Sequence, residues 1–277
     1  AAREGAVDPM NRGPVARWWS RLVNLLSGYS VREREVLGRL VETVFEGIQS
    51  ALTSLLQLGL HLEFYLAGLG LVQLARGAGL DVCLPTWSSA DSPVACEVDG
   101  LFNPFLLHEA TPPIPCQLRL GARGTLMLTG PNSGGKTRLL QSLGVLQLLA
   151  QSGLAVPAKQ AVLPWRDGLF VSLVHEVSSD QKEGRLGTEL MRIRRLFERI
   201  GVGHLVLVDE LCSGTNPSEG EEIVELVISL LGRLQPLAVV STHFLQFAMR
   251  LHAHPPVSDL SFLQVQLDDH RDRKSVV

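Results

Sequence analysis

The amino-acid sequence predicts an α/β fold, in which a mostly parallel sheet is covered by helices and preceded by a helical segment. Two observations lead to this expectation. Apolar residues recur at helical intervals through roughly the first eighty residues. Beyond them, short apolar runs alternate with longer helical patterns, and this alternation is typical of a parallel sheet whose strands are joined by helices.

The helical segment is expected over residues 14–79, as two or three helices. Its most apolar part, Ala51–Leu74, is interrupted by four polar side chains: Gln57, His61, Glu63 and Gln73. A bilayer core penalises such groups, so a buried amphipathic helix is favoured over a membrane span. The chain begins Ala1-Ala2-Arg3 and has no signal-peptide pattern.

A loop rich in Pro and Ser follows Gly79 and separates the helices from what comes after. We place the domain boundary there, with a helical lever-like segment at residues 1–80 and a second domain at residues 81–277. Within the second domain the expected strands are 124–129, 204–208 and 237–241. The expected helices are 136–152 and 244–251, and the charged tail at 271–274 is expected to be frayed.

Composition limits the classes of function. The chain has 277 residues, 45% of them hydrophobic, and a formal net charge of −3. This excludes a small disulfide-stapled scaffold and a general basic field for DNA, so any DNA contact needs a local patch or parts outside this chain. The four cysteines are spaced singly, which predicts neither a zinc site nor a secreted framework, and a cytoplasmic setting is expected.

The expected strand 124–129 runs directly into Gly130–Thr137, which fits the pattern GxxxxGK[ST] and opens a helix. Glycines at such a loop let backbone N–H groups turn inward around a phosphate, and the helix N-terminus adds partial positive charge. Lys136 is expected to reach the β- and γ-phosphates of ATP, and the Thr137 hydroxyl to ligate Mg²⁺. The alternative is a Gly-rich turn that matches by chance. The candidate nucleotide-binding residues are Gly130, Pro131, Asn132, Ser133, Gly134, Gly135, Lys136, Thr137 and Arg138.

Two carboxylates follow a second buried strand. Leu205–Val208 is a continuous apolar run that ends in Asp209-Glu210, at the strand end where such sheets bind ligands. Asp209 is the candidate Mg²⁺ ligand together with Thr137, and Glu210 is the candidate base for the water that attacks the γ-phosphate. Their alternative role is a solvated pair that caps a helix. Together with the loop at 130–137, they predict a P-loop ATPase.

His243 follows a third strand and is the remaining candidate catalytic residue, with Glu210 and Lys136. Taken alone, a histidine after a strand is more often an ordinary surface or cap residue. Its place in the order of motifs gives it weight.

These motifs resemble the C-terminal ATPase domain of the MutS family of DNA mismatch-repair proteins, and the MutS2-like branch more than the classical mismatch binder. The Gly-Pro-Asn form of the loop at 130–137, the segment 209–220, Val156-Pro157-Ala158 and Ser241–Phe244 carry the resemblance. It implies an ABC-type P-loop NTPase fold, lever helices, and dimerisation that places each nucleotide between one P-loop and the partner's signature segment, near Asn216. It also implies that His243 contacts the γ-phosphate.

The sequence departs from the family pattern at several positions. The signature serine falls at Gly184, so recognition of the partner's γ-phosphate would use backbone N–H groups there, or Ser178, Ser179 or Thr188, while Glu189 keeps the acidic position. Pro113-Ile114-Pro115 stands where the family tends to stack an aromatic residue on adenine. Arg138 places a positive charge against the helix dipole. No Phe-x-Glu occurs, so the mismatch-reading wedge is missing.

The preferred function is therefore an Mg²⁺-dependent ATPase domain of a MutS-like DNA-acting protein, working as a homodimer and without a membrane. Two alternatives remain. One is another ABC-class chromosome-maintenance ATPase, against which the lack of a Leu-Ser-Gly-Gly signature argues. The other is a nucleotide-gated interaction module without DNA-specific activity.

Overall fold

The computed structural model describes residues 15, 18–19, 22–23, 26, 29–88, 96–131, 134–173, 185–212, 216–267 and 274–276. The chain divides into two compact units, Ala1–Tyr65 and Leu66–Val277. The candidate site lies wholly in the second unit. The domain boundary that the sequence analysis placed between residues 80 and 81 stays a prediction.

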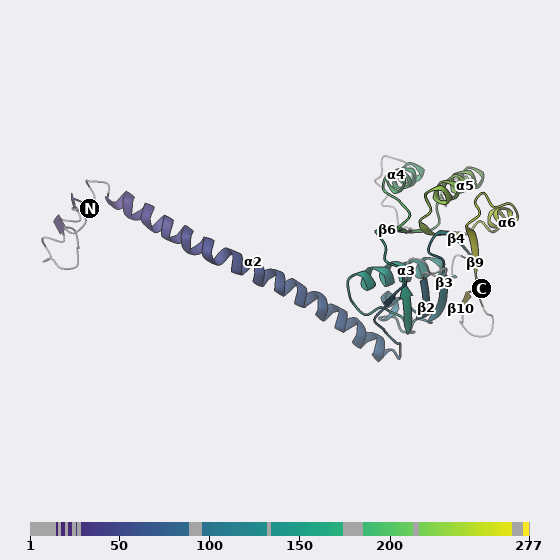
Figure 1. Ribbon diagram of the computed structural model, residues 1–277, viewed down its shortest axis with the longest axis horizontal. Coiled ribbons are helices and arrows are strands. Elements are labelled where there is room, and N and C mark those ends of the chain that lie inside the picture. The colour runs from purple at the N-terminus through teal and green to yellow at the C-terminus, as the bar shows by residue number, and fades with distance from the viewer. Residues whose placement is uncertain are drawn as a thin grey trace. The chain divides into compact units, whose positions relative to one another are not determined.

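Helix α2 runs without interruption over Tyr29–Gly77 (Figure 1). The sequence analysis expected two or three helices over residues 14–79; described residues before α2, at 15, 18–19, 22–23 and 26, are also helical, and residues 29–77 form a single helix. The segment contains no proline, and an isolated glycine in a helix costs only about 1 kcal/mol relative to alanine, which does not break it.

The most apolar part of this helix, which was expected to be buried, is largely exposed in the described chain. Leu55, Leu56 and Leu60 are each more than 60% exposed. By length and composition alone, the stretch Val36–Gly77 is long and apolar enough to cross a membrane, and none of its most apolar window is buried. Core helices of soluble proteins meet the same criterion.

Among the described residues, the main sheet has six strands in the order β10-β9-β4-β8-β7-β6. Its parallel strands are β4 (Gly124–Thr129), β6 (Gly168–Ser172), β7 (His204–Val208), β8 (Leu237–Thr242) and β9 (Leu260–Leu267), while β10 (Lys274–Val276) runs antiparallel to β9. The α/β class with a parallel sheet is thus confirmed. Lys274, expected in a frayed tail, lies in β10.

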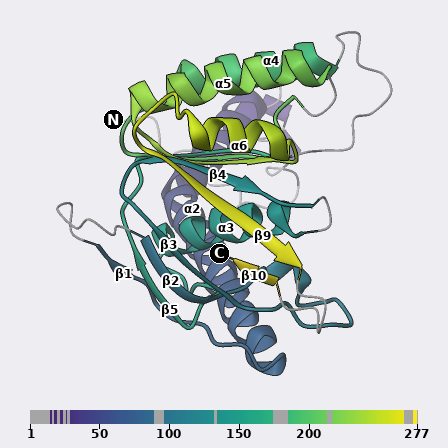
Figure 2. The same ribbon diagram turned by 90° about the vertical axis from the view of Figure 1, so that its right-hand side faces the viewer.

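Helices cover both faces of this sheet (Figure 2). Helix α3 (Lys136–Gln151) packs on one face, and α4 (Arg185–Phe197), α5 (Pro217–Leu234) and α6 (Leu245–Ala253) pack on the other. Side chains alternate between the faces along each strand, so Leu205 and Leu207 join the α3 core whereas Val206 and Val208 join the α5 core.

A second, four-stranded sheet lies on the far side of α3 (Figure 2). Its order is β1-β5-β2-β3, formed by β1 (Thr86–Trp87), β5 (Gln160–Leu163), β2 (Cys96–Leu101) and β3 (Cys116–Leu120), and the short 3-10 helix η3 (Pro104–Leu106) follows β2. Leucines of this sheet share one core with α3 and the main sheet. Helix α3, which begins at the Gly-rich loop, is therefore held between two sheets.

Candidate nucleotide-binding site

Three of the predicted motifs meet at one edge of the main sheet. Strand β8 lies between β4 and β7, with Thr129 opposite Thr242 and Val208 opposite Val240. Because these strands are parallel, their carboxyl ends meet at the same edge. The residues that follow them, from Gly130, Asp209 and His243 onward, are therefore neighbours although they are far apart in sequence.

The Gly-rich loop uses glycine where other residues would not fit. Gly130 has φ +144°, and a Cβ there would lie 2.9 Å from the carbonyl oxygen of Val265. Gly135 caps the start of α3 with φ +87°, in the left-handed region that glycine adopts without steric cost. Asn132 and Ser133 lie outside the described residues. The structure thus forms the strand before the loop and the helix start after it, both of which the motif requires.

Lys136 is almost completely buried at the start of α3, with 2% of its side chain exposed. Its Nζ donates hydrogen bonds of 3.0 Å to the carbonyl oxygens of Gly130 and Pro131 and lies 3.5 Å from Oε1 of Glu210. A buried ammonium requires such partners. Two backbone carbonyls of the loop therefore serve as acceptors for the lysine of the same loop.

Thr137 and Asp209 are in direct contact. The Thr137 hydroxyl donates to Oδ2 of Asp209 at 2.5 Å. Asp209 is buried, and its side chain faces α3 because alternate residues of β7 face that helix. A hydroxyl and a carboxylate, both oxygen donors, thus lie together where the sequence analysis expected the Mg²⁺ ligands.

Glu210 has an unusual backbone conformation, with φ +46°. Its N–H donates to the Ser241 hydroxyl at 3.0 Å, and the side chain is 21% exposed. Oε2 lies 3.9 Å from Nδ1 of His243, a side chain that is 31% exposed. The Nδ1 atom itself is buried and has no hydrogen-bond partner among the described residues. Glu210 is therefore close to both other candidate catalytic residues.

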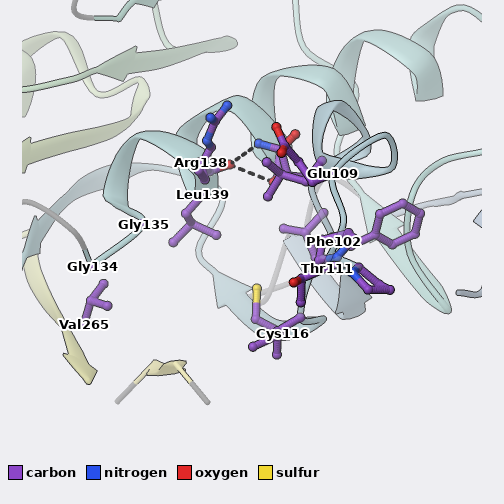
Figure 3. Close-up of a pocket in the computed structure, with 16 residues that line it drawn as sticks. Phe102, Glu109, Thr111, Cys116, Gly134, Gly135, Arg138, Leu139 and Val265 are labelled. Carbon is purple, nitrogen blue, oxygen red and sulfur yellow. Dashed lines mark hydrogen bonds between the residues drawn. The ribbon is translucent and has the colours of Figure 1, made fainter. Parts of the chain in front are cut away.

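A pocket of about 380 Å³ opens beside the Gly-rich loop (Figure 3). Its wall includes Gly134, Gly135 and Arg138 on one side and the segment after β2 on the other. The amide of Asn103 ties these sides together, because its Nδ2 donates to the carbonyl oxygen of Arg138 at 3.1 Å and to Oε1 of Gln141 at 3.1 Å. Sequence reasoning missed Asn103, since only the folded chain brings it to α3.

The remaining lining is mostly apolar. Phe102, Pro113 and Ile114 belong to it. Pro113 and Ile114 are part of the segment 113–115 that the sequence analysis expected at the family's aromatic position. Burial raises the pKa of the Cys116 thiol, also in the lining, to about 11, so this thiol is neutral at ordinary pH.

Other predicted residues are less closely involved. Arg138 lies in the first turn of α3, is exposed and donates to Gln141. Asn216 is the N-cap of α5, where its Oδ1 accepts the Ser218 N–H at 3.4 Å, so in this chain it has a capping role. The predicted signature residues Ser178, Ser179 and Gly184 lie outside the described residues, as do the side chains of Thr188 and Glu189. Among the residues that the structure describes, no group of three or more His, Cys, Asp or Glu could hold a metal ion.

Comparison with known proteins gives a consistent result. The family model for MutS domain V matches residues 126–275. The chain is similar to Endonuclease MutS2 of Thermus thermophilus, at 39% identity over 118 residues, which are 43% of this chain and 16% of that protein. It is also similar to Endonuclease MutS2 of Thermomicrobium roseum (35% over 136 residues) and of Clostridium botulinum (32% over 133 residues), each match covering 47% of this chain and 17% of the relative.

The chain therefore matches less than a fifth of the length of these relatives. The family match, however, extends over more than half of the chain and includes most of β4, the Gly-rich loop, Asp209, Glu210 and His243. From this match and the parallel sheet beneath the site, we conclude that the chain belongs to the MutS domain V family.

Proposed function

We propose that this chain binds ATP with Mg²⁺ and hydrolyses it, as the ABC-type ATPase part of a MutS-like DNA-acting protein. The contact between the Thr137 hydroxyl and the Asp209 carboxylate carries this proposal. It joins the residue after the loop lysine to a carboxylate 72 positions later, beside Lys136 and Glu210. If the loop were a chance Gly-rich turn, or the carboxylates a solvated pair, these four side chains would not be expected to lie together.

The phosphate chain of ATP would bind at the loop around Lys136. In the structure the Nζ of this lysine contacts two backbone carbonyls and one carboxylate, all of them acceptors. Phosphate oxygens offer acceptors of the same kind with more negative charge, so Lys136 can exchange its partners for them. The N-terminus of α3 adds its own N–H groups to this site.

The residues present fit a bound Mg²⁺, since Mg²⁺ prefers hard oxygen ligands and is usually held by one or two protein groups and the phosphates. Thr137 and Asp209 would hold it. When bound, it would neutralise charge on the phosphates. Both residues sit on rigid elements, because Thr137 is in the first turn of α3 and Asp209 follows a buried strand.

Glu210 would act as the general base. In this reaction a water oxygen bonds to the γ-phosphorus, the bond from that phosphorus to the bridging oxygen breaks, ADP leaves with that oxygen, and Glu210 accepts the proton of the water. His243 would contact the γ-phosphate, and its proximity to Glu210 supports this role. The pocket beside Gly134 and Gly135 would receive the nucleoside, between the Asn103 segment and α3.

The dimer and the DNA substrate rest on the family rather than on contacts in this chain. Membership of the MutS domain V family argues against the chromosome-maintenance alternative. We therefore expect a homodimer through the ATPase domain, with DNA bound through a local patch or parts beyond this chain.

ATP binding and hydrolysis by the parent chain and two lysine variants test the proposal. Lys136→Ala should lose ATP binding by about 100-fold or more, because a charge-assisted contact to phosphate disappears from a buried site. Lys159→Ala is the matched control, since Lys159 is exposed and outside the loop. Equal ATP binding by the parent and Lys136→Ala would refute the proposal.

The same assay is repeated with duplex, mismatched and branched DNA. Stimulation of hydrolysis by one form would support the MutS-like function and identify the class of DNA. ATP binding without turnover under every condition would favour the nucleotide-gated interaction module.

A further inference from the structure

Ser241, at the carboxyl end of β8, connects the two acidic residues of the site through a single hydroxyl group. Its Oγ donates a short hydrogen bond to Oδ1 of Asp209 and accepts the backbone N–H of Glu210 at 3.0 Å. Ser241 is buried, with 1% of its surface exposed. Both partners are therefore fixed to a group that water cannot reach.

The position of Ser241 follows from the sheet. Strand β8 is paired with β7 and β4, and Val240 lies opposite Val208, so the next residues, Ser241 and Asp209, are lateral neighbours. Val239 and Leu207 belong to the core on the α3 face, and side chains two residues further along a strand point to the same face. Ser241 and Asp209 therefore face α3, where Thr137 begins the helix.

The Asp209 carboxylate is held at both of its oxygens. Oδ2 accepts from Thr137 and Oδ1 accepts from Ser241. Two hydroxyl donors from different elements fix the plane of the carboxylate, which one donor alone would leave free to rotate. The Ser241 contact comes from the sheet side, so it is independent of the helix that carries the other donor.

The second hydrogen bond of Ser241 bears on the backbone of Glu210. A φ of +46° is uncommon for a glutamate, and such conformations persist only where the surrounding structure enforces them. The Ser241 oxygen receives the N–H of this residue and so helps to enforce the turn. The direction in which the Glu210 side chain leaves the sheet depends on this turn.

We propose that Ser241 is a positioning residue that sets the Asp209 carboxylate for Mg²⁺ and the Glu210 carboxylate for the attacking water. The inference rests on the proposed ATPase function and adds to it a residue that acts through both acidic groups. Groups that orient metal ligands typically change metal affinity or activity by about 10- to 100-fold when they are removed.

Two substitutions at this position and one control test the role. Ser241→Ala removes the hydroxyl, while Ser241→Thr retains it and serves as the conservative rescue. Thr125→Val is the matched control, because Thr125 is also buried, on the neighbouring strand β4, but at its amino end. The full chain is used throughout.

Three readouts separate positioning from folding: binding of a fluorescent ATP analogue in EDTA, the Mg²⁺ concentration that half-saturates binding of the same analogue, and the rate of ATP hydrolysis. For Ser241→Ala we expect unchanged binding in EDTA, a half-saturating Mg²⁺ concentration about 10-fold higher, and hydrolysis slower by about 10- to 100-fold. Ser241→Thr should recover most of both losses, and Thr125→Val should match the parent in all three measurements.

The results that would contradict this role differ from those that would contradict the proposed ATPase function. If Ser241→Ala keeps the parent's Mg²⁺ dependence and rate, the positioning role is wrong while the ATPase proposal stands. If Ser241→Ala loses binding in EDTA as strongly as it loses hydrolysis, or Thr125→Val shows the same Mg²⁺ shift, a general loss of packing explains the result and the inference is overturned. If the parent binds no nucleotide, the proposed function fails, and this inference fails with it.

Discussion

Replacing Glu210 with glutamine tests the chemistry of the site while leaving its shape nearly unchanged. The amide has the size of the carboxylate but carries no negative charge and accepts a proton poorly. Oε1 of Glu210 lies 3.5 Å from Nζ of Lys136, and Oε2 lies 3.9 Å from Nδ1 of His243. Glu210→Gln therefore removes both the proposed proton acceptor and the charged partner of Lys136.

The substitution is expected to slow hydrolysis but to tighten ATP binding. Loss of a general base slows a reaction by about 10²- to 10⁴-fold, which corresponds to roughly 3–5 kcal/mol in the activation barrier. The attraction between charges 3.5 Å apart is about 5 kcal/mol at an effective dielectric constant of 20, and desolvation of both ions offsets most of it. Because Glu210 and the phosphates compete for Lys136, removal of roughly 1 kcal/mol of net attraction to Glu210 would tighten ATP binding by about fivefold.

The assay measures ATP affinity and single-turnover hydrolysis for the parent, Glu210→Gln and Glu221→Gln. Glu221 is the matched control, because it is a partly exposed glutamate that pairs with Arg250 on α6, away from the loop. We expect slow hydrolysis with equal or tighter ATP binding in Glu210→Gln only, and an ATP-dependent dimer in sedimentation. Hydrolysis at the parent's rate would remove Glu210 as the base, and weaker ATP binding would refute the account of the Lys136 pair.

Two further predictions concern single side chains. Thr137→Val should raise the Mg²⁺ concentration needed for ATP binding by about 10-fold or more and leave binding in EDTA unchanged, since it removes one of the two proposed ligands; an unchanged Mg²⁺ titration would contradict this. Burial raises the pKa of Cys116 from 9.0 to about 11, so its thiolate is scarcer below pH 9 in the folded chain. Alkylation at pH 8, followed by mass spectrometry, should be about 100-fold slower than in urea and should accelerate toward pH 11; equal rates in both states would show that the thiol is not protected.

Three strands of the main sheet could be predicted because each contains a continuous apolar run that can be recognised without its distant partner. The strands at 124–129 and 204–208 agree with β4 and β7, and the expected helix 136–152 differs from α3 by one residue. The Gly-rich loop was predictable for the same reason, since its glycines and lysine are consecutive in sequence.

The second sheet could not be predicted strand by strand. Strand β1 has only two residues and pairs with β5, more than seventy positions later, while Cys96–Leu101 has a mixed burial pattern and a register shift against β3. Local patterns do not encode such pairings. The proposed positioning role of Ser241 could not be predicted for a related reason, because it depends on the register of two strands and on the turn at Glu210.

The left-handed backbone of Glu210 has a consequence for the stability of the whole domain. Glycine adopts that conformation without steric cost and asparagine with little, whereas for glutamate it costs about 1 kcal/mol or more. The carboxylate at this position also partners the buried Lys136. The turn therefore carries a backbone cost in order to keep a carboxylate at the sheet edge, and a glycine there would relieve the backbone but leave the lysine with one acceptor fewer.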